Sequence, residues 1–98
     1  MEEKPMSFEQ EVGTIKISAK LPKSAFEQQD LYVLLMCWNK DKSVELWSKI
    51  RNVAISNSTI KDALGVLLKP EELPLEVLDV LMNRYVEMAI DFFTSRLA

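Results

Sequence analysis

The chain contains few of the side chains on which catalysis and metal binding depend. Its 98 residues include no histidine, the commonest general base and metal ligand, and only one cysteine. Cys37 lies in the apolar run LYVLLMCW, so we expect a buried, unreactive thiol. Glu71, Glu72 and Asp79 could be imagined as paired catalytic carboxylates, but a linker and the polar stripe of a helix explain them better. The sequence therefore predicts no enzymatic activity, no cofactor and no metal site.

Composition places the chain among globular proteins. Hydrophobic residues make up 48% of it and charged residues 28%, with only two glycines, so we expect one folded domain with few loops. The N-terminus MEEKPMSFEQ is acidic and has no apolar segment, unlike a secretory signal. The longest apolar run, 31–38, is much shorter than the roughly 20 residues of a membrane span. We predict a soluble, cytoplasmic protein.

Charge is distributed unevenly along the chain, whose net charge is −3. Residues 1–14 contain four glutamates and one lysine, residues 15–51 contain seven cations and four acids, and residues 52–98 contain four cations and seven acids. The middle of the chain is thus positive and both ends are negative. Such asymmetry bears on binding partners rather than on the fold, although chance variation in a short chain explains it equally well.

The beginning of the chain predicts an acidic tail, a strand and a helix. Residues 1–13 precede any clear pattern, and we expect them to be a mobile tail. In residues 14–21 apolar side chains occupy every second position, which is typical of a half-buried strand. Pro22 ends that strand and suits the first turn of a helix over about 23–38.

Residues 31–50 admit two interpretations. We favour helices, because the apolar residues between 43 and 55 follow the spacing of one helix face, with Ser43 ahead of them as N-cap. The alternative is a hairpin with strands at 31–38 and 43–50. Periodicity alone does not decide between them.

The C-terminal half predicts a short helix over 59–68, a linker over 69–74 and a long helix over 75–96. The apolar stripe of this last helix is much wider than the ~100° that a surface helix needs. A chain this short buries only about 60–65% of the surface that its unfolded form exposes, so we expect part of that stripe to meet another protein surface. The candidate interface residues are Met82, Tyr85, Met88, Ala89, Phe92 and Phe93.

The predicted strand IKISAKLP has a polar face that could contact a partner. Alternation turns its apolar residues inward and turns Lys16, Ser18 and Lys20 outward. Lysine and serine are suited to hydrogen bonds with base edges in DNA. The simpler interpretation is a strand whose lysines stay solvated and discourage aggregation.

Residues 15–51, with IKISAKLP followed by helices, resemble ribbon-helix-helix DNA-binding proteins, the family of small Arc- and MetJ-like repressors. The resemblance implies that strands of two subunits pair into an antiparallel ribbon that enters the major groove. It would assign DNA contacts to Lys16, Ser18 and Lys20, with the backbone amides after Ser43 facing phosphate.

Together these observations predict a mainly α-helical domain with a short N-terminal β-strand, completed by oligomerisation. We expect a non-enzymatic protein that acts by protein–protein contact, such as an adaptor, a regulatory module or an assembly chaperone of the kind that phages and mobile elements encode. Its partner would be a second copy of the chain or another protein, with no membrane or small-molecule substrate. A dimeric ribbon-helix-helix transcriptional regulator is the alternative.

Overall fold

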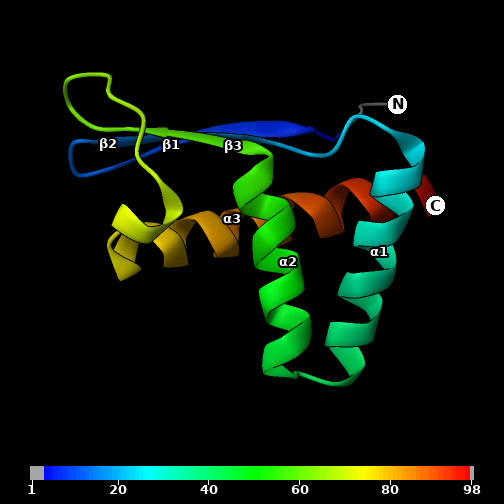
Figure 1. The fold of residues 1–98 in the computed structure, drawn as a ribbon. Helices are drawn as coiled ribbons and strands as arrows, with labels where there is room; N and C mark the ends of the chain where they lie inside the picture. Colours follow the sequence, from blue (N-terminus) through cyan, green and yellow to red (C-terminus); the bar gives the residue numbers. More distant parts are fainter. Residues whose placement is uncertain (1–3, 98) are drawn as a thin grey trace.

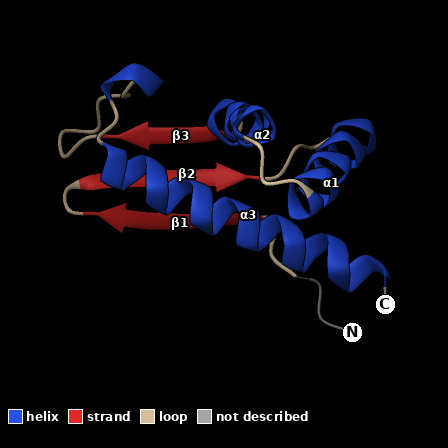
Figure 2. Cartoon of the chain, turned by 90° about the horizontal axis from the view of Figure 1, so that it is seen from below, coloured by secondary structure: helices blue, strands red, loops and turns tan. Residues whose placement is uncertain are grey.

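A computed structural model describes residues 4–97, which form a three-stranded antiparallel sheet and three α-helices (Figure 1). The fold is therefore mixed α and β, and the expectation of a mainly helical domain with one strand is wrong in this respect. The long helix α3 crosses one face of the sheet, while α1 and α2 form a helical hairpin at one end of it (Figure 2). The elements in chain order are β1 (Ser7–Val12), β2 (Ile15–Lys20), α1 (Ala25–Lys40), α2 (Val44–Ser56), β3 (Ser58–Lys61), the 3-10 turn η1 (Pro70–Glu72) and α3 (Leu75–Leu97).

Strands β1 and β2 form a hairpin with a two-residue turn. Val12 lies opposite Ile15, and Gly13 adopts φ +61°, a conformation that glycine reaches without a steric penalty. The predicted tail over 1–13 is thus wrong for residues 7–12, while residues 1–3 lie outside the described part of the chain. Only Phe8 and Val12 are apolar in SFEQEV, so this strand depends on pairing with β2 rather than on a pattern of its own.

Strand β2 is the predicted strand, and it occupies the centre of the sheet. It pairs with β1 along one edge and with β3 along the other. Ile17 and Ala19 are buried, as alternation predicted. Its central position and one buried face explain why this strand, unlike β1 and β3, could be recognised in the sequence.

The helix predicted over 59–68 is wrong. Residues 58–61 form β3, because α2 ends at Ser56 with Asn57 as its C-cap, and the β-branched Thr59 and Ile60 extend along β2. A turn follows, in which the Asp62 carboxylate accepts hydrogen bonds from the backbone N–H groups of Leu64 and Val66. Gly65 in this turn has φ +83°, which a helix would not allow.

The interpretation of residues 31–50 as helical is confirmed, and the hairpin alternative is wrong. Both α1 and α2 have a serine as N-cap, Ser24 and Ser43. The hydroxyl of each serine accepts a hydrogen bond from the backbone N–H three residues further along. Near their connection Trp38 and Trp47 stack with ring centroids 5.0 Å apart, and the Lys42 ammonium lies 3.6 Å from the Trp38 ring centre. The hairpin thus closes its own end far from the sheet (Figure 1).

The core lies between the sheet and α3 and continues between α3 and α1. Ile17 and Leu31 are among the side chains fully buried there, as are Leu81 and Tyr85 of α3. The predicted helix over 75–96 is confirmed as α3. Its wide apolar stripe is explained within one chain, because α3 touches the sheet on one side and the helical hairpin on another.

Candidate functional site

The face of the sheet that points away from α3 is uncovered and polar. Lys16, Ser18 and Lys20 all lie on it and are exposed, as alternation in the sequence predicted. The strand register places Glu11 and Lys61 on either side of Lys16. The other exposed side chains of this face are Ser7, Glu9 and Thr59.

A shallow hollow of about 690 Å³ lies over this face. Lys16 and Lys61 line it on one side, and Glu9 and Glu11 line it on the other. The hollow is therefore of mixed charge, and the cations predicted to contact DNA stand beside carboxylates. Such a surface attracts phosphate less strongly than an unmixed cluster of lysines would.

The arrangement of β2 differs from the strand of a ribbon-helix-helix protein. That ribbon pairs one strand from each of two subunits, which requires a free edge. Both edges of β2 are occupied within this chain, one by β1 and one by β3. The polar side chains of β2 face outward as the resemblance implies, but a two-chain ribbon through β2 does not fit this sheet.

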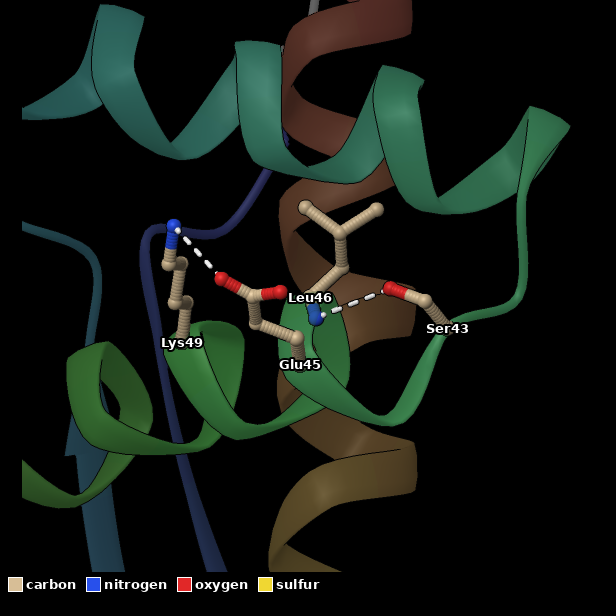
Figure 3. Close-up of polar contacts among 4 residues, drawn as sticks. All are labelled: Ser43, Glu45, Leu46 and Lys49. Atoms are coloured by element: carbon tan, nitrogen blue, oxygen red, sulfur yellow. Dashed lines mark hydrogen bonds and ion pairs between the residues drawn. The ribbon is translucent and has the colours of Figure 1, made fainter.

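Ser43 lies apart from the sheet, at the far end of the α1–α2 hairpin. Its hydroxyl accepts a 3.1 Å hydrogen bond from the Leu46 N–H, as Figure 3 shows. In the next turn Glu45 and Lys49 form an exposed ion pair at 3.7 Å, which contributes little to stability (Figure 3). The structure therefore assigns Ser43 to capping a helix and does not bring it together with the three polar residues of β2.

The residues proposed as an interface on the last helix are mostly core. Met82, Tyr85, Met88, Ala89 and Phe92 are buried within the chain. Phe93 is half-buried, and its ring meets Tyr32 of α1 edge-on at 5.5 Å. The expectation that these side chains form a free surface is wrong for the folded chain, so the width of the stripe no longer calls for a second copy.

The outer edge of β1 offers backbone groups for binding, and sequence reasoning missed it. The Leu21 N–H donates to the Met6 carbonyl over 2.8 Å, which shows that even-numbered residues of this strand hydrogen-bond to β2. In an antiparallel pair the residues between them turn their N–H and C=O groups the other way. The backbone groups of Ser7, Glu9 and Glu11 therefore point outward from the sheet.

These outward groups are nearly all free among the described residues. The Glu11 carbonyl accepts a 3.0 Å hydrogen bond from the Gln10 side chain, and no strand pairs with the outer side of β1. The other edge of the sheet differs. There the Leu68 N–H donates to the Ile60 carbonyl and the Asp62 N–H donates to the Val66 carbonyl, so the returning chain covers part of β3.

The C-terminal half of helix α3 extends past the β1 edge on the covered side of the sheet, and we call this part of the helix the ledge. Helix α3 crosses the sheet diagonally, and its C-terminal half leaves the sheet on the β1 side (Figure 2). A hollow of about 200 Å³ lies where edge and helix meet, lined by Pro5, Ser7, Phe8, Arg84, Glu87, Met88 and Asp91. The Arg84 guanidinium connects α3 to β1: it donates a 2.6 Å hydrogen bond to the Gln10 side chain and lies 4.8 Å from the Phe8 ring centre.

Several large apolar side chains are exposed elsewhere. Phe26, Val33 and Met36 lie on the outer side of α1, and Leu64 and Leu67 lie in the loop after β3. Cys37 is exposed as well, so the prediction of a buried thiol is wrong, because α1 packs through Leu31 and Leu35 instead. These side chains are separate groups on different elements.

Within residues 4–97 no three cysteine or carboxylate side chains lie close enough together to hold a metal ion. Over the same residues, no helix combines the length and the apolar character that crossing a membrane requires. Comparison of the chain with protein-family models, with curated protein sequences and with solved structures finds no match. Function must therefore be inferred from the site itself.

Proposed function

We propose that this protein is a non-enzymatic binding module that holds an extended segment of another protein against the outer edge of β1. The observation that carries this proposal is the row of outward N–H and C=O groups on Ser7, Glu9 and Glu11 beside the ledge of α3. An added strand gains main-chain hydrogen bonds from such an edge, and pockets for its alternate side chains provide selectivity.

The surroundings of β1 support strand addition. A strand that continues the sheet lies about 4.8 Å outside β1, where its inward side chains would stand above the hollow lined by Phe8 and Met88. Its other side chains would join the polar face of the sheet. Native proteins usually cover or shorten an exposed edge of this kind, because it invites pairing with other chains. This edge is six residues long, and all six residues pair with β2.

A substitution at Glu9 tests the proposal with little disturbance of the sheet. The N–H of Glu9 points outward, so Glu9→Pro removes a donor of the open edge and no hydrogen bond between β1 and β2. Peptides that bind the natural chain can be selected from a random displayed library. We expect these peptides to bind the Glu9→Pro variant much more weakly than the natural chain. Glu9→Thr is the matched control, since it removes the same carboxylate but keeps the N–H.

Hydrogen exchange provides a second measurement that does not depend on the stability of the proline variant. In the complex with a selected peptide, the amides of Ser7, Glu9 and Glu11 should become protected, while those at the exposed end of the α1–α2 hairpin should not change. Peptides that bind Glu9→Pro as well as they bind the natural chain, without protection of these amides, would show that the edge is not the binding site.

DNA binding by the uncovered sheet face is a second candidate function. The observation in its favour is that Lys16, Lys20 and Lys61 all point outward from that face. This candidate predicts DNA binding that weakens steeply with salt and disappears in Lys16→Ala/Lys20→Ala, measured by fluorescence anisotropy with duplex DNA. Lys23→Ala/Lys40→Ala, which removes equal charge from α1 and the segment before it, should bind as before. Equal loss in both double variants would contradict a role for the sheet face.

A further inference from the structure

We infer that the segment bound at the β1 edge is basic. This inference rests on the proposed function, because it concerns the chemistry of the strand that β1 receives. It follows from the charges on the two sides of the edge, which an added strand would meet with its alternate side chains.

Carboxylates line both sides of the position that an added strand would occupy. On the open face of the sheet, Glu9 and Glu11 are exposed side chains of β1 itself. On the ledge, Glu87 and Asp91 are exposed and line the hollow below the edge. These two pairs lie on opposite sides of the same strand position, so an incoming strand would meet carboxylates on each of its two faces.

The cations nearest this edge are Arg84 on α3 and two lysines on β2. Arg84 keeps its charge and offsets part of that of Glu87 and Asp91, although its guanidinium is turned to the Gln10 side chain and the ring of Phe8. Lys16 and Lys20 lie opposite Glu11 and Ser7, but they belong to β2 and are thus one strand further from the edge than the carboxylates of β1. Opposite charges on directly paired strands stabilise the pairing, whereas like charges destabilise it. A strand that carries lysine or arginine therefore fits this edge better than a neutral or acidic strand does.

The same charges disfavour a second copy of the chain as the occupant. If β1 paired with its own copy about a two-fold axis, the registers with most overlap would place Glu9 opposite Glu9, or Glu9 opposite Glu11. Either register brings like charges together across the new pair. We therefore assign the edge to a different, basic partner rather than to self-association.

Synthetic peptides of equal length test this inference with the intact chain. In each peptide threonine alternates with a second residue, which is lysine, glutamine or glutamate. We expect the lysine peptide to bind at least about tenfold more tightly than the glutamine peptide at low salt, and the glutamate peptide to bind most weakly. The advantage of the lysine peptide should shrink as salt is added.

Two variants locate the charges responsible. The lysines of an alternating peptide all lie on one side of the strand, so they face only one of the two pairs of carboxylates. One of the two double variants, Glu9→Gln/Glu11→Gln or Glu87→Gln/Asp91→Asn, should therefore reduce the affinity for the lysine peptide by about tenfold. Glu71→Gln/Glu72→Gln removes the same charge from η1 and should leave binding unchanged, which separates local contacts from the effect of net charge.

The outcomes distinguish this inference from the proposed function. If the glutamine peptide binds as tightly as the lysine peptide, and both lose binding to Glu9→Pro, strand addition stands and the preference for basic segments is refuted. If neither pair variant weakens the lysine peptide, or if the η1 variant weakens it equally, the inference is also refuted. If the synthetic peptides and the peptides selected from the library all bind Glu9→Pro as tightly as the natural chain, the proposed function itself is refuted.

Discussion

The Tyr85 hydroxyl donates a 2.9 Å hydrogen bond to the backbone carbonyl of Lys20. Lys20 is the last residue of β2, and its N–H donates to the Asn57 carbonyl over 3.1 Å. In a regular antiparallel pair, Asn57 would return a hydrogen bond to Lys20. The Asn57 N–H instead donates back to Val53 and Ala54 at the end of α2. The phenol of Tyr85 thus takes the place of the missing strand neighbour.

Tyr85→Phe should therefore destabilise the chain by more than the loss of an exposed hydroxyl would. The substitution leaves the Lys20 carbonyl without its partner, and we expect the free energy of unfolding to fall by about 1–3 kcal/mol. Urea denaturation followed by circular dichroism measures this change. Tyr32→Phe is the matched control, since Tyr32 contacts Phe93 through its ring, and it should cost less than about 0.5 kcal/mol. Equal effects in both variants would refute the role of the Lys20 contact.

Stability should also fall at alkaline pH because of Tyr85. Burial raises the pKa of its phenol well above the ordinary value of 10.0. Above pH 10 the unfolded chain releases the phenol proton while the folded chain retains it. The free energy of unfolding therefore decreases as pH rises, by up to about 1.4 kcal/mol per pH unit. Below pH 10, this group makes no pH-dependent contribution. Denaturation at several pH values should show a steeper alkaline decline for the natural chain than for Tyr85→Phe; parallel declines would contradict the prediction.

Two phenylalanines distinguish core from surface. Phe92 of α3 is 5% exposed and belongs to the core, whereas Phe26 is 76% exposed on α1. We expect Phe92→Ala to lower the free energy of unfolding by about 3–5 kcal/mol and Phe26→Ala to change it by less than about 0.5 kcal/mol. Thermal or urea unfolding of both variants measures this. A Phe92→Ala variant that keeps its stability but loses a binding partner would restore the interface first expected on this helix.

The cap of α2 should contribute measurably to stability. Ser43→Ala removes the acceptor for the Leu46 N–H, so we expect a loss of about 1 kcal/mol. Ser56→Ala is the control at the other end of the helix, where the hydroxyl only donates back to the Val53 carbonyl. Urea denaturation should place this control within about 0.5 kcal/mol of the natural chain. A Ser43→Ala chain of unchanged stability would imply that water replaces the cap.

The features that could be predicted from the sequence have a period or a cap of their own. Strand β2 alternates strictly because one of its faces is buried, and Ser43 stands directly before an apolar helical face. Strands β1 and β3 lack such signals. β1 has two apolar residues in six, and β3 has only four residues, so both depend on pairing with β2, which the local sequence does not encode.

The candidate site was missed for a related reason. An unpaired edge is defined by which strand has no neighbour, and that depends on the topology of the whole sheet. The charges around it are contributed by Glu9 and Glu11 near one end of the chain and by Glu87 and Asp91 near the other. The one local signal was the run of glutamates in the segment first interpreted as a tail. Likewise, the apolar stripe of the last helix did not reveal that one chain covers it on two sides.

The position of α3 in the chain also determines when folding can be completed on the ribosome. The apolar face of the sheet, with Phe8, Ile17 and Ile60, is covered by a helix that is synthesised after every strand. At ordinary translation rates the 23 residues of α3 take roughly one to five seconds to make. Until α3 packs onto the sheet, the strands that have emerged have an uncovered apolar side as well as an open edge. A chain in which α3 has not yet packed is therefore the form in which we expect this protein to depend most on chaperones and to be most susceptible to aggregation.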